Sequence, residues 1–459
     1  MNFSYLRREP GFYRRVFTLA LPVVLQNLIT TSLGFMDTFM VGLVGQEQMS
    51  AVTVANVPIY IIQLIVFGLQ SGSRVLISQF WGRGDRESIN RVMGIGFFVA
   101  GGISTLCALT MGLFPRQVLM LITDNARLVE LGTSYIRIVG FSYILNSLSS
   151  IYIGMQQSIE NPRFGMTVFA ISTVCNTVGN YILIFGKLGL PALGITGAAI
   201  ATFSSRVVEF VISLVYALHC KQMPLLPACI LRPGKATFRS FVKFSTPVLL
   251  NETLWGTGTS LYTVIMGHMA GSTDLISAYT VAGNIDKMVT VAIFGVAAAV
   301  IVGKEVGMGG KNAYPIGQAL TFVAFCTGFG VAIAEQILFW LVLKPHVLPL
   351  FSMTAASASL CVTMMICYSI SAPLHAFATT GIVGVLRGGG DVRIAMLIDV
   401  LPLWCFTLPL LVLLGLVLHA PIAIFCFIMA TESALKVPFG LHRIRGGKWI
   451  HDVTQDLNA

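Results

Sequence analysis

The sequence predicts an all-α integral membrane protein with twelve transmembrane helices in two pseudo-symmetric six-helix bundles. Hydrophobic residues make up 55% of the 459-residue chain, charged residues only 10%, and the mean hydropathy is +0.82. Soluble domains carry about 25% charged residues. Apolar runs of about 20 or more residues recur along the chain, and each can cross a hydrocarbon core of about 30 Å. We therefore expect the chain to lie in a lipid bilayer.

Twelve apolar runs define the expected spans in order. Those of the first half lie near 16–43, 52–76, 92–114, 131–156, 165–186 and 194–218. Those of the second half lie near 240–269, 276–302, 314–343, 358–385, 393–415 and 417–439. The first run is too long for the apolar core of a signal peptide, and no small-residue cleavage site follows it. It is expected to stay as an uncleaved helix.

The two halves of the chain repeat one another. Pro22 matches Pro247 and Gly42 matches Gly267, each pair separated by 225 positions. Six spans bring the second half into the membrane from the same side as the first, so the repeat is parallel and substrate should bind between the lobes. Proline and glycine in 221–240 interrupt the helical pattern. We therefore expect an N-lobe at 1–225 and a C-lobe at 226–459.

The net charge of +10 reflects orientation rather than nucleic-acid binding. Of the 29 Lys and Arg residues, the twelve-span arrangement puts 21 in cytoplasmic segments, five in external segments and three within helices. This bias predicts that both termini are cytoplasmic and that the chain is a multi-pass protein of the plasma (inner) membrane. Nine cysteines without a C-x-x-C motif are expected to be packing residues.

Two carboxylates inside apolar spans are the main functional candidates. A charge at the bilayer centre costs at least about 2.5 to 3.5 kcal/mol and normally faces a bundle interior or an aqueous cavity. Asp37 is far in sequence from any basic residue, and Gln26, Thr30 and Gly34 lie along roughly the same helical face. This stripe predicts a polar cavity. The alternative is an acid that is hydrogen-bonded at a helix junction.

Glu252 is the second candidate, with Trp255, Gly256 and Thr259 on its helical face. A carboxylate beside an indole ring suits an organic cation through charge and cation-π attraction. The alternative is a structural carboxylate that neighbouring backbone or Asn251 satisfies.

Other polar residues within the spans have both a functional and a structural interpretation. Asn176 and Asn180 are one turn apart, and the second span aligns Asn56, Tyr60, Gln63 and Gln70. They can line a cavity or form interhelical hydrogen bonds. His375 is a candidate proton carrier or a structural donor. Two acids, Glu209 and Glu432, lie three and four residues from Arg206 and Lys436, which predicts structural ion pairs on helix surfaces.

Several motifs resemble the multidrug and toxic compound extrusion (MATE) family over the whole chain. They are Leu21-Pro22 through Met36-Asp37-Thr38-Phe39-Met40-Val41-Gly42, the Glu252 helix, Asn180-Tyr181-Ile182-Leu183-Ile184-Phe185-Gly186 and Leu386-Arg387-Gly388-Gly389-Gly390-Asp391. The resemblance implies two six-helix bundles that form a V-shaped central cavity. It also implies a secondary antiporter, not an enzyme, that exports cationic or amphiphilic drugs in exchange for Na⁺ or H⁺ without a cofactor.

The resemblance also assigns residues. Asp37 matches the first-helix aspartate of the family, and Glu252 matches the seventh-helix glutamate of its bacterial drug-exporting branch. That branch often carries an aspartate where this chain has Ala376, beside His375, and a second branch carries an aspartate where this chain has Asn180. The Na⁺ ligands would be Asp37 and Glu252, and the ion-coupling residues would be these two with Asn180.

The expected substrate-binding residues are drawn from both lobes: Glu252, Trp255, Gln26, Asn56, Tyr60, Asn176 and His375. The expected partners are cationic small molecules and the lipid bilayer, with no nucleic acid, and the protein is expected to be a monomer. The alternative function is a flippase or exporter of a lipid-linked or amphiphilic metabolite, although such proteins usually need a basic cavity. No constellation of catalytic residues indicates an enzyme.

Overall fold

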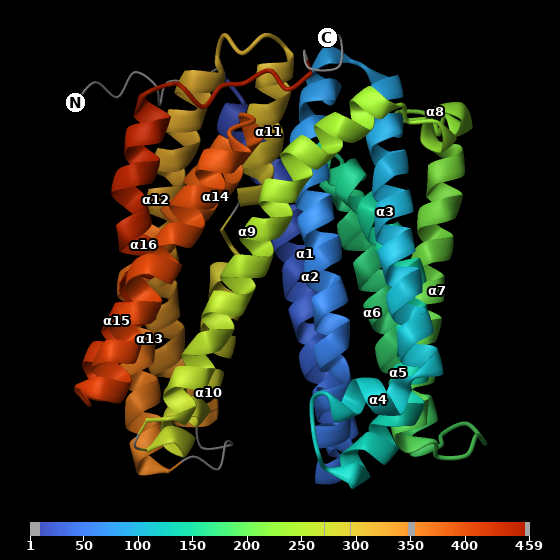
Figure 1. The fold of residues 1–459 in the computed structure, drawn as a ribbon, viewed down its shortest axis with the longest axis vertical. Coiled ribbons are helices and arrows are strands. Elements are labelled where there is room, and N and C mark those ends of the chain that lie inside the picture. Colours follow the sequence, from blue (N-terminus) through green and yellow to red (C-terminus); the bar gives the residue numbers. More distant parts are fainter. Residues whose placement is uncertain (1–9, 270, 294, 348–353, 455–459) are drawn as a thin grey trace. The chain divides into compact units, whose positions relative to one another are not determined.

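A computed structural model describes residues 10–269, 271–293, 295–347 and 354–454 of the chain (Figure 1). Within these ranges the chain is helical and contains no β-strand; Gly390 and Ile450 form an isolated bridge. Eleven helices are long and apolar enough to cross a membrane. One more, α9 (Lys235–Gly267), has 33 residues and is long enough by length alone. The predicted all-α, multi-pass membrane fold is confirmed.

The six spans expected in the first half each correspond to one helix. These are α1 (Phe12–Gly42), α2 (Gln46–Arg83), α3 (Arg86–Leu113), α5 (Ala126–Ser158), α6 (Pro162–Phe185) and α7 (Gly194–His219), with the short helices α4 (Pro115–Met120) and α8 (Pro227–Leu231) between or after them. Local chemistry sets several ends. Gly84 and Gly186 adopt the left-handed conformation directly after α2 and α6, which glycine tolerates without steric cost. Asp85 caps α3 by accepting from the Ser88 amide at 3.0 Å.

The second half is less regular than expected. After α9 come α10 (Ser272–Thr290), α11 (Gly295–Gly307), α12 (Ala313–Leu338) with its π-helical extension η2 (Phe339–Val347), α13 (Ala355–Phe377) with η4 (Ala378–Leu386), α14 (Val392–Leu401), η5 (Pro402–Thr407), α15 (Leu408–Val412), η6 (Leu413–Val417) and α16 (Ile422–Arg445). The span expected at 276–302 is divided between α10 and α11. The segment 221–240, expected to be non-helical, contains α8 and the start of α9, because Pro227 occupies the first position of a helix, where its missing N–H costs nothing.

The chain forms two compact units whose boundaries lie inside α1 and α9. We call residues 25–249 the N-unit, and residues 10–24 together with 250–454 the C-unit. The expected lobe boundary was at residue 225. Instead, the chain passes between units two residues after Pro22 and two residues after Pro247. A proline inside a helix removes one backbone hydrogen bond and weakens the helix locally, so these are natural points for one helix to serve two units.

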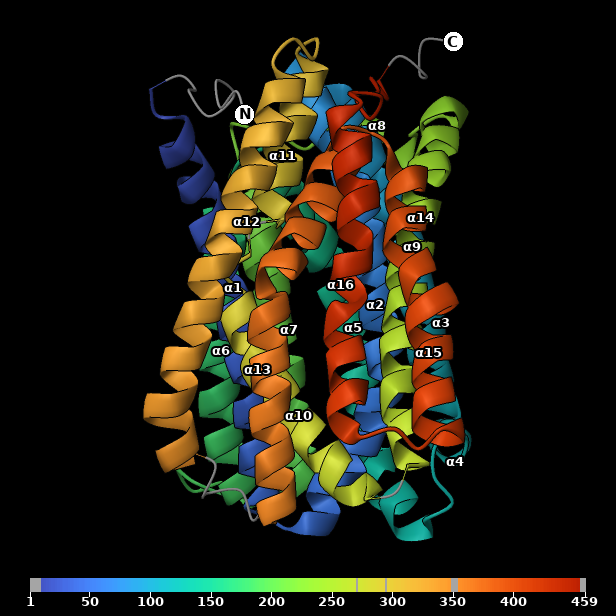
Figure 2. The ribbon, with the colours of Figure 1, turned by 90° about the vertical axis from the view of Figure 1, so that its left-hand side faces the viewer.

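Each unit is built around a central helix. In the N-unit α5 packs extensively against α2, α3 and α7, and α6 packs on α7. In the C-unit α13 packs against α10, α12 and α16 (Figure 2). The C-unit contains two apolar cores. One joins the first turns of α1 (Val16, Leu19 and Ala20) to α11, α12 and η4, and the other joins α9, α10, α13 and α16.

Candidate functional site

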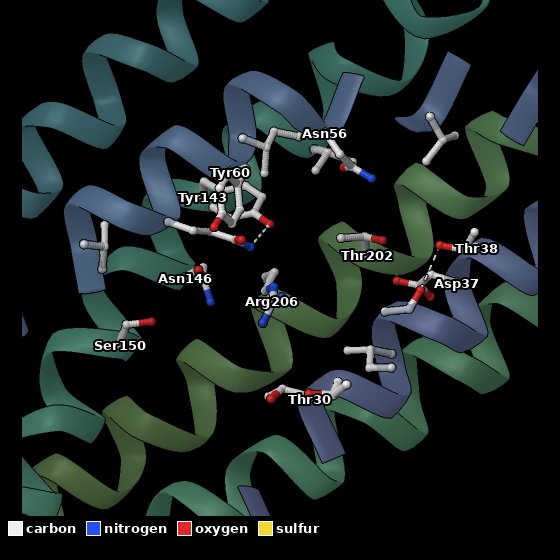
Figure 3. Close-up of a pocket in the computed structure, with 18 of the residues that line it drawn as sticks. Thr30, Asp37, Thr38, Asn56, Tyr60, Tyr143, Asn146, Ser150, Thr202 and Arg206 are labelled. Atoms are coloured by element: carbon white, nitrogen blue, oxygen red, sulfur yellow. Dashed lines mark hydrogen bonds between the residues drawn. The ribbon is translucent and has the colours of Figure 1, made fainter. Parts of the chain in front are cut away.

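A cavity of about 570 Å³ lies inside the N-unit, and helical stripes from α1, α2, α5 and α7 line it (Figure 3). Its polar lining residues are Thr30, Thr31, Asp37, Thr38, Asn56, Tyr60, Gln63, Gln70, Tyr135, Tyr143, Asn146, Ser150, Thr202 and Arg206. Apolar residues, including Phe67 and Phe169, complete the wall. Ligand pockets are typically about 300–1,000 Å³ and combine apolar surface with a few polar groups. This cavity therefore has the size and lining of a small-molecule site.

Asp37 of α1 is held at the cavity wall by an asparagine from α6. The Nδ2 of Asn180 donates to Oδ1 of Asp37 at 2.6 Å and to Oδ1 of Asn176 at 3.0 Å. Since both partners are acceptors, the Asn180 amide must present its nitrogen to them, which fixes its orientation. Its Oδ1 is then buried and without a hydrogen-bond partner. A buried acceptor left unpaired is costly, and beside a carboxylate it favours a bound cation.

Arg206 of α7 lies on the same wall, so the cavity contains charges of both signs. Its Nη1 is 2.7 Å from Oε2 of Glu209, and the Nδ2 of Asn146 donates to Oε1 of Glu209 at 3.1 Å. The predicted structural pair Arg206–Glu209 is confirmed. In Figure 3, Asp37 lies on one side of the cavity and Tyr143 and Asn146 on the other, with Arg206 along the wall between them. Because Arg206 pairs directly with Glu209, Asp37 has no ion-pair partner of its own among the described residues, although the charge of Arg206 reaches it.

Some of the N-unit residues expected to bind substrate line the cavity, and others lie outside its wall. The stripe of Asn56, Tyr60, Gln63 and Gln70 lines the cavity, as do Thr30 and Gly34. Asn176 is buried behind Asn180, where its Nδ2 donates to Thr202 at 3.4 Å.

Gln26 belongs to a separate buried cluster. Its Oε1 accepts from Gln157 at 3.1 Å, and Gln157 in turn accepts from Arg74 at 3.2 Å. Gln26 was expected on the same polar stripe as Asp37. It lies three turns before Asp37, where its amide bonds to Gln157 of α5, so this end of the stripe faces protein and not the cavity.

Glu252 has a cationic partner from its own unit. Its Oε1 lies 2.6 Å from Nη1 of Arg387, which is only 2% exposed. Arg387 is one of the 21 basic residues expected in cytoplasmic segments, but its burial at the end of η4 makes it a structural partner and not an exposed cytoplasmic charge. Asn251, the partner considered for Glu252, instead donates to Asp399 at 2.8 Å.

A buried charge network continues from this pair. Lys436 lies 2.7 Å from Asp399 and 2.6 Å from Glu432, and Tyr262 donates to Glu432 at 2.7 Å. The predicted Glu432–Lys436 pair is confirmed, although Lys436 was expected to be cytoplasmic and is 3% exposed. Three carboxylates and two cations thus share the interior of the C-unit.

The two remaining C-unit candidates flank this network. His375 of α13 is half-buried, experiences the charges of Lys436, Glu432 and Asp399, and makes no hydrogen bond to another residue of the described ranges. Trp255 of α9 is 38% exposed. Glu252, Trp255 and His375 do not line the N-unit cavity. The described ranges also contain no group of three or more His, Cys, Asp or Glu side chains arranged to bind a metal ion.

Helix α5 contributes a polar stripe that was not expected. Tyr135, Val139, Tyr143, Asn146 and Ser150 all line the cavity. Their spacing of four, four, three and four residues is that of one face of a helix. The same stripe search that found Asn56 and Tyr60 would have found them, since tyrosine and asparagine at this spacing in an apolar span are equally unusual.

Comparisons with known proteins agree with these features. Residues 22–182 match the family model MatE. The chain is 24% identical to the probable multidrug resistance protein NorM of Thermotoga maritima over 315 residues, which cover 67% of each chain. It is 26% identical to the multidrug resistance protein MdtK of Edwardsiella ictaluri over 414 residues, which cover 88% of each chain.

Solved structures share the fold. A MATE structure in complex with MaL6 aligns with a TM-score of 0.85 and 16% identity, covering 97% of this chain and 99% of that one. A mutant of the Vibrio cholerae MATE transporter VcmN aligns with a TM-score of 0.82 and 18% identity, covering 94% and 97%. The matching family model over residues 22–182, the relatives across most of the chain and the shared fold show that this chain is similar to the MATE family of membrane transporters.

Proposed function

We propose that the protein is a secondary active antiporter that exports cationic or amphiphilic drugs in exchange for Na⁺ or H⁺. The observation that carries this proposal is the N-unit cavity, in which Asp37 has no ion-pair partner of its own among the described residues and stands beside the unpaired Oδ1 of Asn180. The names of the NorM and MdtK relatives, both multidrug resistance proteins, support drugs as the substrate class. We place the transporter in the plasma (inner) membrane as a monomer.

The proposed coupling uses competition at Asp37. An organic cation in the cavity is attracted by the aspartate and by the exposed ring of Tyr60, which can form a cation-π contact. A Na⁺ or proton that neutralises Asp37 removes most of that attraction. Two ligands that exclude each other must do so reciprocally, so entry of the ion releases the drug and entry of the drug releases the ion.

Alternating access then follows from whether Asp37 is empty or has the drug or the ion bound. A charged, empty Asp37 is costly in a cavity closed to water, so a conformational change that closes the cavity requires either the drug or the ion to be bound. Export results when the ion binds from the outside and the drug from the inside. Asn180 and Thr202, on the same wall, are the residues proposed to share the ion with Asp37. Roles of Glu252, Trp255 and His375 in a C-unit site remain predictions.

The decisive test is the ion dependence of drug binding. Fluorescence anisotropy of a cationic dye on purified protein should show affinity that falls as Na⁺ or H⁺ increases. In Asp37→Asn the amide mimics the neutral carboxyl group, so most of that dependence should disappear. A matched control is Glu130→Gln, which removes a carboxylate paired with Arg127 at the surface of the same unit.

Two outcomes would contradict the proposal. An unchanged ion response in Asp37→Asn would place the switch elsewhere. Transport of a fluorescent lipid across proteoliposomes, without transport of the cationic dye, would favour the flippase alternative.

A further inference from the structure

A second carboxyl site, remote from the charge network of Glu252, lies in the C-unit. Glu335 of α12 is 0% exposed, and its Oε1 is buried without a hydrogen-bond partner. Its other oxygen, Oε2, lies 2.8 Å from the Oγ of Ser369 on α13. No Lys or Arg of the described ranges forms an ion pair with it. An ionised carboxylate in this position would have one neutral hydrogen-bond partner and no counter-charge within the membrane.

The nearest acidic charge makes ionisation less favourable still. Asp286 of α10 is close enough to Glu335 for their charges to interact. Its carboxylate is half-buried and makes no ion pair or hydrogen bond in the described ranges, although Lys287 contributes a weak opposing field. The other titratable groups that face Asp286 from the packed helices are the neutral hydroxyls of Tyr279 and Tyr368.

The two carboxyl groups lie at similar positions along their helices. Asp286 is 12 residues from the start of the Asp274–Gly307 span, and Glu335 is 12 residues before the end of η2 at Val347. Both residues thus lie well inside their helices, counted from the same end of the unit. The helices that carry them, α10 and α12, both pack on α13. Glu335 is thus sealed inside, while the half-buried Asp286 is accessible beside it.

The hydrogen bonds at Ser369 can all be satisfied when Glu335 carries a proton. The Ser369 Oγ accepts from Nε2 of Gln336 at 2.7 Å and lies 3.0 Å from the Met365 carbonyl, as well as 2.8 Å from Glu335. The hydroxyl has one hydrogen and two lone pairs. It can donate to Met365 and accept from Gln336, and the third contact is then satisfied if the Glu335 carboxyl group donates to it.

We propose that Glu335 and Asp286 form a proton-binding site of the C-unit in which Glu335 holds the proton. A proton suits this site better than a metal ion because it needs no shell of oxygen ligands, and the buried Glu335 offers only one free oxygen. On release, the O–H bond of Glu335 breaks and the proton leaves through Asp286 and water. As a second proton-coupling site, distinct from Asp37, it rests on the proposed antiport function.

Infrared spectroscopy tests the bound proton without requiring transport. The full-length protein in a maltoside detergent, which has no ester carbonyl, should show a carboxylic-acid C=O band at neutral pH that is lost in Glu335→Gln. The matched control Glu432→Gln removes a buried glutamate of the same unit that forms an ion pair with Lys436, so the band should remain. Asp286→Asn should also retain it. A spectrum of Glu335→Gln that matches wild type would overturn the proposal, as would loss of the band in Asp286→Asn alone.

Proteoliposomes test whether the site takes part in transport. Export driven by a pH gradient should become less dependent on pH in Glu335→Gln, while equilibrium binding of the dye to the N-unit cavity stays unchanged. If the band is lost as expected but the pH dependence of export is unaltered, the coupling role of Glu335 is overturned. If wild-type protein exports no dye under any ion gradient while the band is present, the proposed antiport function fails and the proton site stands.

Discussion

At the scale of single residues, the environment of Asn180 shows how one atom can set ion preference. Its amide already uses its nitrogen on Asp37 and Asn176, so only a neutral oxygen remains for a cation. Replacement by aspartate would put a second negative charge beside Asp37. Such a pair repels itself when empty and attracts a cation more strongly than one carboxylate does.

We expect Asn180→Asp to lower the Na⁺ concentration that halves dye affinity by about tenfold, equivalent to about 1.4 kcal/mol. Dye anisotropy across a Na⁺ series measures this. Ser150→Asp is the control, because it adds the same charge to the cavity wall on the side opposite Asp37 in Figure 3. An equal effect in both variants would mean that overall cavity charge, and not a local ion site, is responsible.

The Glu252–Arg387 pair gives a prediction about stability. Removing one partner of a buried ion pair leaves the other charge unpaired and costs about 3–5 kcal/mol, whereas removing both is much less harmful. Glu252→Gln should therefore lower the Tm of the detergent-solubilised protein, and adding Arg387→Gln should recover part of the loss. Arg387 also has a weaker contact with Asp399, at 3.9 Å, so Glu252→Gln does not leave it wholly unpaired. The loss of stability should therefore be toward the lower end of that range.

The outcome also bears on the site predicted at Glu252. A Glu252→Gln variant with wild-type Tm but impaired export would support binding of a substrate or coupling cation there. A lowered Tm that the double variant restores would assign the glutamate to structure.

Local pairs could be predicted from the sequence, but long-range pairs could not. Arg206–Glu209 and Glu432–Lys436 follow from helical spacing alone, and both occur. The partners of Asp37 and Glu252 lie 143 and 135 positions away in the chain. No periodicity within one helix encodes such contacts. The ion-pair role of Arg387 was not expected for the same reason, since a basic residue near the end of a span looks cytoplasmic until its partner is known.

At the scale of helices, apolar runs located the spans well but not their internal breaks. Each expected span overlaps a helix or a continuous series of helical segments. The break between α10 and α11 and the π-helical segments η2, η4, η5 and η6 lie inside uniformly apolar sequence. Hydropathy does not locate these segments, because an α-helix and a π-helix of the same apolar sequence have the same mean hydropathy. Packing of neighbouring helices decides where such turns form.

The segment after α16 forms a specific contact that the sequence did not suggest. Trp449 is 0% exposed, and its Nε1 donates to the Ile444 carbonyl at 3.0 Å. The indole lies on Gly317 and Gly389, and a Cβ at Gly389 would overlap the ring. The amide of His451 also donates to the Gly389 carbonyl at 2.7 Å. Glycines of the Leu386–Asp391 motif are therefore needed to let the C-terminal segment approach.

We expect Trp449→Ala to destabilise the protein by about 3–5 kcal/mol, the usual cost of removing a fully buried tryptophan side chain. The Tm of the purified protein measures the effect. Trp340→Ala is the matched control, because Trp340 is 46% exposed and should shift the Tm much less. Equal shifts in the two variants would show that the packing of the C-terminal segment does not contribute to stability.

At the scale of the whole chain, the distribution of basic residues predicts the orientation of the protein in the membrane. Burial of Arg387 and Lys436 removes two of the 21 residues counted as cytoplasmic, which leaves 19 against five external ones. The bias survives the correction. The last turn of α16 alone carries His442, Arg443 and Arg445. Because positively charged segments are retained on the cytoplasmic side, the loop between α11 and α12 and the segment after α16 should face the cytoplasm.

Cysteine labelling in intact cells tests this orientation. A membrane-impermeant maleimide should react with Asp124→Cys and Leu188→Cys, which lie in exposed loops on the predicted external side. It should react with Lys311→Cys and Lys448→Cys only after the membrane is opened. The unsubstituted chain, with its nine native cysteines, sets the background in both conditions. Labelling of Lys448→Cys and Leu188→Cys from the same side would contradict the odd number of spans expected between them, and with it the twelve-span arrangement on which the parallel repeat depends.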